Sequence, residues 1–287
     1  MAIIVPAMPI KDTLMFIDIA VNITDKLLAK DEDSIEDVIK RCKDGKVFPI
    51  FTGLDHHTSK SCVNLARKYK TVSTVGIHPT SSSKYKDVDG IIPLIDDDTV
   101  VAIGECGLDY DRLEFADKAS QKRIFKSQLD LGGDCYFLHS RSCHRDFMEA
   151  ISDYRIRGVV HSFTGSIEEA NELIKKGLFI GINGCSVKTL EGVDVVRNLP
   201  LDSLLIETDS PYCKIRKSYA GFKYAASDFS YEKALKKRNE PCCIVQIAEI
   251  ISNVTGKDYS YVVETVFGNT IRLYGDLLRR SVEEWGL

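Results

Sequence analysis

Short apolar runs alternate along the chain with longer stretches in which apolar residues recur at helical spacing. Eight of the runs are apolar throughout instead of alternating with polar residues, which is typical of strands buried on both faces of a parallel sheet. We predict strands at residues 14–19, 47–51, 72–77, 100–103, 136–138, 159–160, 178–182 and 204–206.

The intervening stretches predict helices that begin and end at recognisable signals. Ser166 and Glu169 have the Ser-x-x-Glu spacing of a capping box, and Gly177 ends the helix that follows. The predicted helices cover residues 30–43, 58–69, 117–131, 145–154, 166–176, 187–198, 241–253 and 259–273, with a weak helix at 91–95.

The regular alternation of strand and helix predicts an α/β fold, the (β/α)8 or TIM barrel. Each strand-to-strand step takes about 27 residues, close to the roughly 30 that one βα unit needs. An open doubly wound sheet is the alternative, but neither G-x-G-x-x-G nor G-x-x-x-x-G-K-[ST] occurs in the chain. We expect one barrel domain at residues 14–275, an amino-terminal extension at 1–13 and a polar carboxyl-terminal tail at 276–287.

Composition limits the binding partners and the cellular locations that fit this fold. The net charge of −4 gives the chain no overall attraction to nucleic acid, so a basic surface has to be local. Nine cysteines without a Cys-x-x-Cys pair indicate reduced thiols of an intracellular protein, not a disulfide framework or a zinc ribbon. Because no signal peptide or membrane-spanning run is evident, we expect no membrane association and a cytoplasmic or nuclear location.

Polar residues that could do chemistry follow the predicted strands directly. In a barrel the carboxyl ends of all strands meet at one mouth, where active sites are built. The side chains at these ends are Asp18, Asn22, Thr52, His78, Glu105, His139, His161, Asn183 and Asp209.

Glu105, His139, His161 and Asp209 form the strongest group among them. A carboxylate at the end of a buried strand must be paired, protonated or metal-bound, because burying it alone is costly. Two imidazoles and two carboxylates that face one point suit a borderline or hard divalent ion. We therefore predict a shared metal site at the mouth of the barrel.

Three further polar residues carry weaker signals. His56 and His57 lie in a predicted loop after the second strand, and we expect them to be solvated or structural. Asp18 is either a ligand at the rim of the site or a structural hydrogen-bond acceptor.

At these residues the sequence resembles the TatD family of metal-dependent deoxyribonucleases, within the amidohydrolase-like barrels. The resemblance extends from Phe16 to about Tyr274. It rests on seven motifs in order: Phe-Ile-Asp-Ile-Ala-Val-Asn-Ile-Thr at 16–24, Val-Gly-Ile-His-Pro at 75–79, Ala-Ile-Gly-Glu-Cys-Gly-Leu-Asp at 102–109, Phe-Leu-His-Ser-Arg at 137–141, Val-Val-His-Ser-Phe-Thr-Gly at 159–165, Leu-Ile-Glu-Thr-Asp-Ser-Pro-Tyr at 205–212 and Arg-Asn-Glu-Pro at 238–241.

The resemblance implies two metal sites that share a carboxylate. Glu105 matches the shared ligand, His139 and His161 match the other ligands of one metal, and Asp209 matches a ligand of the second metal and the base for the attacking water. Many members carry His-x-His after the first strand, whereas this chain has Ala20 and Asn22. We therefore expect one strong metal site and one weak one.

The implied reaction is hydrolysis of DNA phosphodiester bonds by a metal-activated water, with 3′–5′ exonuclease action on single-stranded DNA. The resemblance favours Mg²⁺, while the ligand set alone also admits Zn²⁺ or Mn²⁺. We expect no obligate protein partner. Arg141 has a structural ion pair as its alternative role. The candidate substrate-binding residues are His78, Arg141, His144, Asn183 and Arg238.

The loop from Cys213 to Arg238 is the local basic feature. It carries eight Lys or Arg residues against Asp228 and Glu232, with six aromatic residues from Tyr212 onward. Cations for the phosphate backbone and aromatics for the bases suit a single strand entering the mouth. The alternative is a solvated basic loop whose aromatic residues pack as a lid.

Two other functions remain open at this point. Because the barrel supports varied chemistry, the protein could hydrolyse a small ester or amide. It could also be a binding protein that has lost activity together with the His-x-His pair, although Glu105, His139, His161 and Asp209 argue against this.

Overall fold

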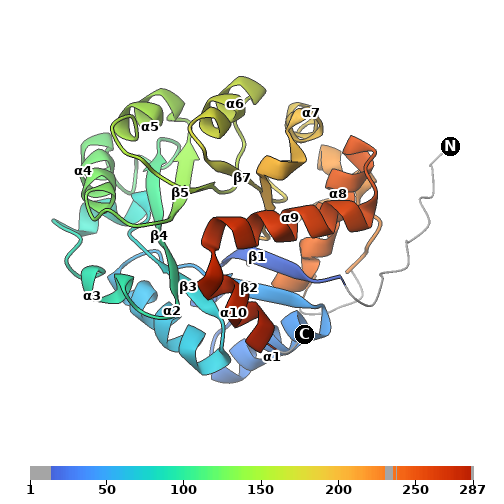
Figure 1. Ribbon diagram of the computed structural model, residues 1–287, viewed down its shortest axis with the longest axis horizontal. Helices are drawn as coiled ribbons and strands as arrows, with labels where there is room; N and C mark the ends of the chain where they lie inside the picture. The colour runs from blue at the N-terminus through green and yellow to red at the C-terminus, as the bar shows by residue number, and fades with distance from the viewer. Residues whose placement is uncertain (1–13, 230–234, 237, 286–287) are drawn as a thin grey trace.

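The computed structural model describes residues 14–229, 235–236 and 238–285, so the expected extension at 1–13 lies outside the described residues. Eight parallel strands follow one another in the order of the sequence and form a barrel surrounded by helices (Figure 1). The strands are β1 (Phe16–Val21), β2 (Val47–Phe51), β3 (Val72–Val75), β4 (Val100–Asp109), β5 (Tyr136–Arg141), β6 (Gly158–Val160), β7 (Phe179–Ile182) and β8 (Leu204–Ile206).

The barrel closes at its mouth, where the strands end. A parallel bridge joins Val21 to Ser210, and the backbone N–H of Asn22 donates to the Ser210 carbonyl at 3.0 Å. The residues that follow β8 therefore lie against the end of β1. This arrangement confirms the (β/α)8 barrel over the open sheet.

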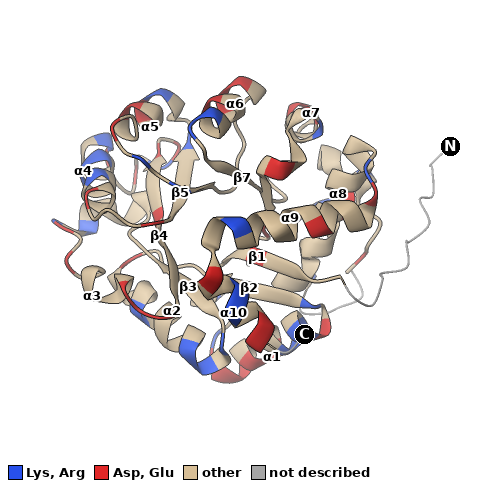
Figure 2. Cartoon of the chain, in the orientation of Figure 1, with Lys and Arg blue, Asp and Glu red and all other residues tan. Residues whose placement is uncertain are grey.

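The helices of the barrel have amphipathic sequences, and Figure 2 shows that the charged residues lie mostly on the helices and loops, while the strands inside carry few. The α-helices are α1 (Glu32–Asp44), α2 (His56–Tyr69), α3 (Ile92–Ile95), α4 (Lys118–Leu129), α5 (His144–Ala150), α6 (Ile167–Lys175), α7 (Leu190–Asn198), α8 (Val245–Thr255), α9 (Tyr259–Tyr274) and α10 (Asp276–Glu284). Short 3₁₀ helices are η1 (Pro79–Lys84), η2 (Leu201–Ser203), η3 (Ala220–Tyr224) and η4 (Pro241–Ile244).

Local signals in the sequence fix several helix starts. The predicted capping box at Ser166 is confirmed, and Asp31 and Asp55 cap α1 and α2 in the same way. Because Asp55 is the cap, His56 and His57 form the first turn of α2, and their placement in a loop was wrong. The His56 ring packs on Tyr85 with ring centroids 4.1 Å apart, whereas His57 is exposed. Among the described residues, no helix is both long and apolar enough to cross a bilayer.

Strand β4 is longer than the apolar pattern predicts, and it shapes the mouth. The prediction ended this strand at residue 103, yet it continues to Asp109 alongside β5. Gly107 permits the close approach of the two strands, since a Cβ atom there would lie 1.9 Å from the His139 carbonyl oxygen. Glu105 therefore lies within a strand and not after it.

The segment expected to be a polar tail instead forms α10. Leu278, Val282 and Trp285 are buried in one cluster with Ile17, Phe48 and other residues near the amino ends of the strands. The Trp285 ring meets Phe48 of β2 edge-on, with centroids 5.3 Å apart. Helix α10 thus covers the end of the barrel opposite the mouth.

We expect Leu278→Ala to destabilise the protein by about 2–5 kcal/mol, because Leu278 is fully buried and its loss leaves a cavity. Urea unfolding, followed by circular dichroism, measures this change. The control is Leu190→Ala on α7, which removes the same atoms from a side chain that is 67% exposed. Equal effects of the two substitutions would mean that α10 does not contribute to the folded core.

Candidate metal centre and active site

The predicted site residues come from four strands of the barrel and meet at its mouth. Glu105 lies on β4 and His139 on β5, while His161 follows β6 and Asp209 follows β8. Glu105, His139 and His161 are almost fully buried, and Asp209 is partly exposed. The topology thus brings together residues that lie far apart in the sequence.

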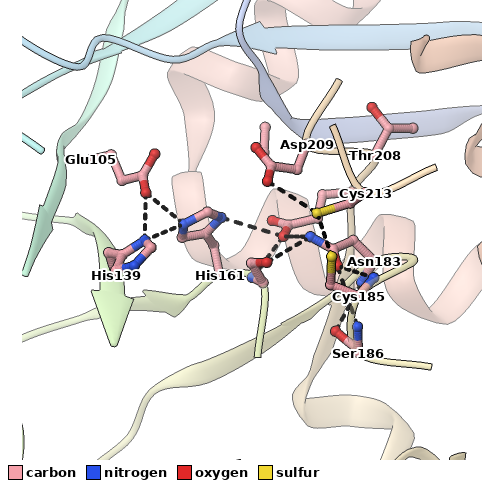
Figure 3. A network of polar contacts seen from close by, with 12 residues as sticks. Glu105, His139, His161, Asn183, Cys185, Ser186, Thr208, Asp209 and Cys213 are labelled. Carbon is pink, nitrogen blue, oxygen red and sulfur yellow. Dashed lines mark hydrogen bonds and ion pairs between the residues drawn. The ribbon is translucent and has the colours of Figure 1, made fainter. Parts of the chain in front are cut away.

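One carboxylate oxygen is the centre of the site (Figure 3). Glu105 Oε1 lies 2.7 Å from His139 Nδ1 and 2.7 Å from His161 Nε2, and these two nitrogens are 3.1 Å apart. His78 Nε2 approaches the same oxygen at 3.1 Å. His78, which we predicted as a phosphate contact, therefore touches the candidate metal ligand itself.

Two further carboxylates lie against the imidazoles, and the sequence prediction gave them no role. Asp109 Oδ2 lies 3.1 Å from His139 Nε2, and Glu207 Oε1 lies 3.4 Å from His161 Nδ1. A carboxylate on one ring nitrogen directs the lone pair of the other nitrogen toward the site. The signal was present, because both residues lie inside the motifs at 102–109 and 205–212.

The buried charges shift the pKa values of these groups in opposite directions. Burial alone would raise the pKa of Glu105, but His161, His78 and His139 hold it well below its ordinary value. Burial would lower the pKa of His161, but Glu105 and Glu207 raise it well above the usual range. Burial dominates at His78, whose pKa is lowered. A cation is therefore strongly favoured beside Glu105.

The donor set fits a divalent metal ion. Glu105, His139 and His161 each offer a ligand atom, and these atoms lie within 4.8 Å of one another in buried surroundings. One carboxylate oxygen and two imidazole nitrogens, with carboxylates behind both rings, are the pattern that protein sites use for transition metals and Zn²⁺. A second such group is formed by His78, Asp109 and His139.

Asp209 lies beside this group and contributes to neither ligand cluster. Its Oδ1 accepts a hydrogen bond from Asn22 Nδ2 at 3.0 Å, and its Oδ2 accepts one from the Cys213 thiol at 3.3 Å. Burial raises the pKa of Asp209 to about 6, an effect that His161 partly offsets and that Glu105 and Glu207 reinforce. Asn22, which replaces a possible histidine ligand, thus contacts Asp209 directly.

Asp18 has the structural role that was one of its two alternatives. It is fully buried and accepts hydrogen bonds from the Thr208 backbone N–H at 2.9 Å and from the Thr208 hydroxyl. Burial raises the pKa of Asp18 to about 8, although the bonds from Thr208 lower it. The side chain ties β1 to the segment that carries Asp209.

Three residues predicted to bind substrate are engaged with protein groups. Arg141 Nη1 lies 3.7 Å from Asp109, consistent with its structural alternative. His144 Nε2 lies 2.9 Å from Glu172 on α6. Asn183 is buried and donates to Glu207 at 3.0 Å. Any contact of these residues with substrate remains a prediction.

A basic groove of about 890 Å³ lies between the segment after β1 and the loop after β8. It begins beside Asp209, since Tyr212 and Cys213 line it. Asp228 is the one acidic residue among its described lining residues. Its cationic lining residues are Lys26, Lys30, Lys214, Arg216, Lys217, Lys236 and Arg238.

The loop from Cys213 to Arg238 has aromatic residues that pack as in the lid alternative, whereas its contact with a single strand stays a prediction. Phe222, Tyr224 and Phe229 pack against the main hydrophobic cluster, as in a lid, while Tyr212 is 47% exposed. Arg238 lines the groove but also pairs with Glu240 at 2.7 Å. Six residues of the predicted loop lie outside the described residues, namely Ser230, Tyr231, Glu232, Lys233, Ala234 and Lys237.

Comparison with known proteins agrees with this geometry. The family model described as TatD related DNase matches residues 17–275. A protein of Encephalitozoon cuniculi named "Putative deoxyribonuclease TATDN1 homolog" is 80% identical over 95% of this chain and all of its own length. The Escherichia coli protein named "3'-5' ssDNA/RNA exonuclease TatD" is 35% identical over 90% of this chain and 98% of its own.

A solved structure resembles the whole barrel. The crystal structure of a hydrolase TatD family protein from Entamoeba histolytica aligns with a TM-score of 0.85 and 32% identity, over 91% of this chain and 98% of the other. The fold, the motifs and the family match agree over the same residues. The chain therefore belongs to the TatD-related DNase family of hydrolases.

Proposed function

We propose that this protein is a divalent-metal-dependent deoxyribonuclease that degrades single-stranded DNA from the 3′ end. The observation that carries the proposal is the convergence of Glu105 Oε1, His139 Nδ1 and His161 Nε2 at separations of 2.7–3.1 Å, with Asp209 next to them. The name of the E. coli relative supports the 3′–5′ polarity and admits RNA as a second substrate.

The residues divide the chemical work. An ion bound by Glu105, His139 and His161 supplies Lewis-acid stabilisation to the negative charge that develops during phosphodiester cleavage. Asp209 orients the attacking water and takes its proton. Asp109 and Glu207 keep both imidazoles in the orientation that presents lone pairs to the site.

The identity of the ion is part of the proposal. Mg²⁺ is the ion that the family resemblance favours, whereas two histidine nitrogens also accept Mn²⁺ or Zn²⁺. We propose that a second, weaker site uses Glu105, Asp209 and at most the amide oxygen of Asn22, because Ala20 and Asn22 stand where many family members have histidine ligands. Cleavage assays with each ion in turn show which of them supports activity.

The basic groove makes nucleic acid a better substrate than a small ester or amide. Of its seven cations, Lys214 donates to backbone carbonyls and Arg238 pairs with Glu240. The exposed cations Lys26, Lys30, Arg216, Lys217 and Lys236, beside Tyr212, are left to contact phosphates that lie outside the catalytic centre. Nine cysteines as free thiols suit a reducing compartment, so we place this activity in the cytoplasm or the nucleus.

The decisive experiment incubates a 5′-labelled single-stranded oligonucleotide with the protein in Mg²⁺ or in EDTA. We expect a ladder of progressively shortened products in Mg²⁺ and none in EDTA. A circular single strand has no 3′ end and should survive, so its cleavage would refute exonuclease action. Absence of any metal-dependent cleavage would refute the proposed function.

A double alanine variant tests the groove separately. We expect Arg216→Ala together with Lys217→Ala to weaken single-strand binding and to lower the slope of log K against log salt by about 0.7 for each phosphate that these side chains neutralise. Both side chains are exposed and line the groove. Fluorescence anisotropy with a labelled oligonucleotide in EDTA measures this binding without cleavage.

The matched control for the groove replaces Lys175 and Lys257, which are exposed and do not line it. The control removes the same number of positive charges, so an effect of net charge alone would weaken DNA binding equally in both variants. An unchanged salt slope in the groove variant would show that the strand takes another path.

A further inference from the structure

Two cysteine thiols face each other at the mouth of the barrel. Cys185 Sγ lies 2.9 Å from Cys213 Sγ, and Figure 3 shows the pair beside Asp209. Cys185 belongs to the loop after β7 and Cys213 to the loop after β8. Six of the nine free cysteines are buried, and only Cys185, Cys213 and Cys242 are partly exposed.

The surrounding backbone holds the two loops together. A Cβ atom on Gly184 would lie 1.9 Å from the carbonyl oxygen of Cys213, so only glycine permits this close approach. The Asn183 side chain accepts a hydrogen bond from the Cys185 backbone N–H at 2.9 Å. The sulfur atoms are therefore kept adjacent by contacts that do not depend on the thiols.

The pair is also connected to the active site. The Cys213 thiol donates to Asp209 Oδ2 at 3.3 Å, and Cys213 lines the basic groove. A disulfide would require the sulfur atoms to approach from 2.9 Å to roughly 2.05 Å. That bond would remove the S–H donor from Asp209 and fix the wall of the groove.

We propose that Cys185 and Cys213 form an oxidation-sensitive dithiol that a peroxide converts to an intramolecular disulfide, which lowers the activity of the enzyme. The disulfide rests on the geometry alone, whereas the effect on activity rests on the function proposed above. One thiol attacks hydrogen peroxide, the O–O bond breaks, and a sulfenic acid and one water form. The second thiol attacks that sulfur, the S–O bond breaks, and the disulfide and a second water form.

In this reaction each sulfur atom gives up one electron, and the peroxide accepts two. Both thiol protons leave in the water molecules. A dithiol reductant reverses the step by thiol–disulfide exchange, so the modification can be switched off in a reducing compartment.

Peptide mapping tests the disulfide without any nuclease assay. Trypsin places Cys185 in residues 177–188 and Cys213 in residues 198–214, each as the sole cysteine of its peptide. After treatment with peroxide and blocking of the remaining thiols, we expect these two peptides to be joined and to separate on reduction. Absence of the joined peptide would overturn the proposal.

The effect on activity is tested with variants of the full chain in which one cysteine is replaced by serine. We expect peroxide to lower wild-type cleavage of single-stranded DNA by about 10- to 100-fold, the usual cost of losing a hydrogen bond behind a site residue, with recovery in dithiothreitol. Cys185→Ser should resist this loss. Cys242→Ser, at the third partly exposed cysteine, should remain as sensitive as wild type.

Peptide mapping and the cleavage assay together distinguish an error in the disulfide proposal from an error in the proposed function. A joined peptide in a protein that never cleaves DNA would refute the nuclease and leave the disulfide intact. Full activity of the oxidised enzyme, or equal peroxide sensitivity of Cys185→Ser and wild type, would refute control of the site by this pair.

Discussion

Replacing Glu105 by alanine should abolish metal binding and lower DNA cleavage by about 10²–10⁴-fold or more. The reason is that a single oxygen of Glu105 contacts His78, His139 and His161 at 2.7–3.1 Å. Removing either His139 or His161 deletes one ligand, whereas removing Glu105 deletes the negative charge that all of them share. We therefore expect Glu105→Ala to lose more metal binding and more activity than His139→Ala or His161→Ala. Isothermal titration with Mn²⁺ and cleavage assays on these three variants measure both losses.

The same substitution should destabilise the metal-free protein by about 3–5 kcal/mol, because it breaks a buried ion pair and leaves His161 facing neighbouring imidazoles. Glu172→Ala is the matched control, since it removes the carboxylate from the Glu172–His144 pair, where the Glu172 side chain is 58% exposed. That loss should stay below about 1 kcal/mol. Glu105→Gln keeps the shape and separates loss of charge from misfolding. Metal binding by Glu105→Ala that is as tight as, or tighter than, binding by either histidine variant would contradict the central role of this oxygen.

Asp209→Asn should lower the cleavage rate by about 10²–10⁴-fold and leave binding of the first metal almost unchanged. Asp209 lies outside the group formed by Glu105, His139 and His161, so its charge is needed for proton transfer more than for that ion. Titration calorimetry and single-turnover cleavage separate the two quantities. Loss of metal binding in this variant would make Asp209 a ligand of the first metal instead of the base.

The pH dependence of the reaction gives an independent check on Asp209. Burial raises its pKa to about 6 in the metal-free protein, and a base must be deprotonated to act. Cleavage by wild type should therefore fall as the pH drops through about 6, or lower if a bound cation stabilises the carboxylate. The residual activity of Asp209→Asn should not show this fall at low pH.

Asp109→Asn should have a different effect, because Asp109 contacts His139 and not the attacking water. We expect this substitution to weaken metal binding by about 10- to 100-fold through His139.

Periodicity was sufficient to predict the barrel, but it failed where a strand or helix departs from a simple apolar run. Strand β4 was expected to end at residue 103, because the apolar run ends there and Glu105 follows it. In the structure Gly107 instead allows β4 to continue against β5. Helix α10 was mistaken for a tail, although Leu278, Val282 and Trp285 have the spacing of one helical face.

The candidate site was predictable in its ligands and less so in its surroundings. Glu105, His139, His161 and Asp209 each follow an apolar run, so their convergence follows from the barrel alone. The contacts of Asp109 and Glu207 with the histidines could not be predicted, because they depend on the length of β4 and on the path of the chain after β8. The Cys185–Cys213 contact depends on two loops whose approach no periodic pattern encodes.

The length of β4 also constrains how the sequence between Glu105 and Asp109 can change. These residues contact opposite nitrogens of the one His139 ring, at 2.7 and 3.1 Å. Side chains alternate in direction along a strand, so inserting or deleting a single residue would turn one carboxylate away from the ring. The part of the loop after β8 that follows Cys213 can change in length without such an effect, because surface loops absorb insertions. Variation in length should therefore be tolerated along the groove but not in this short segment of β4.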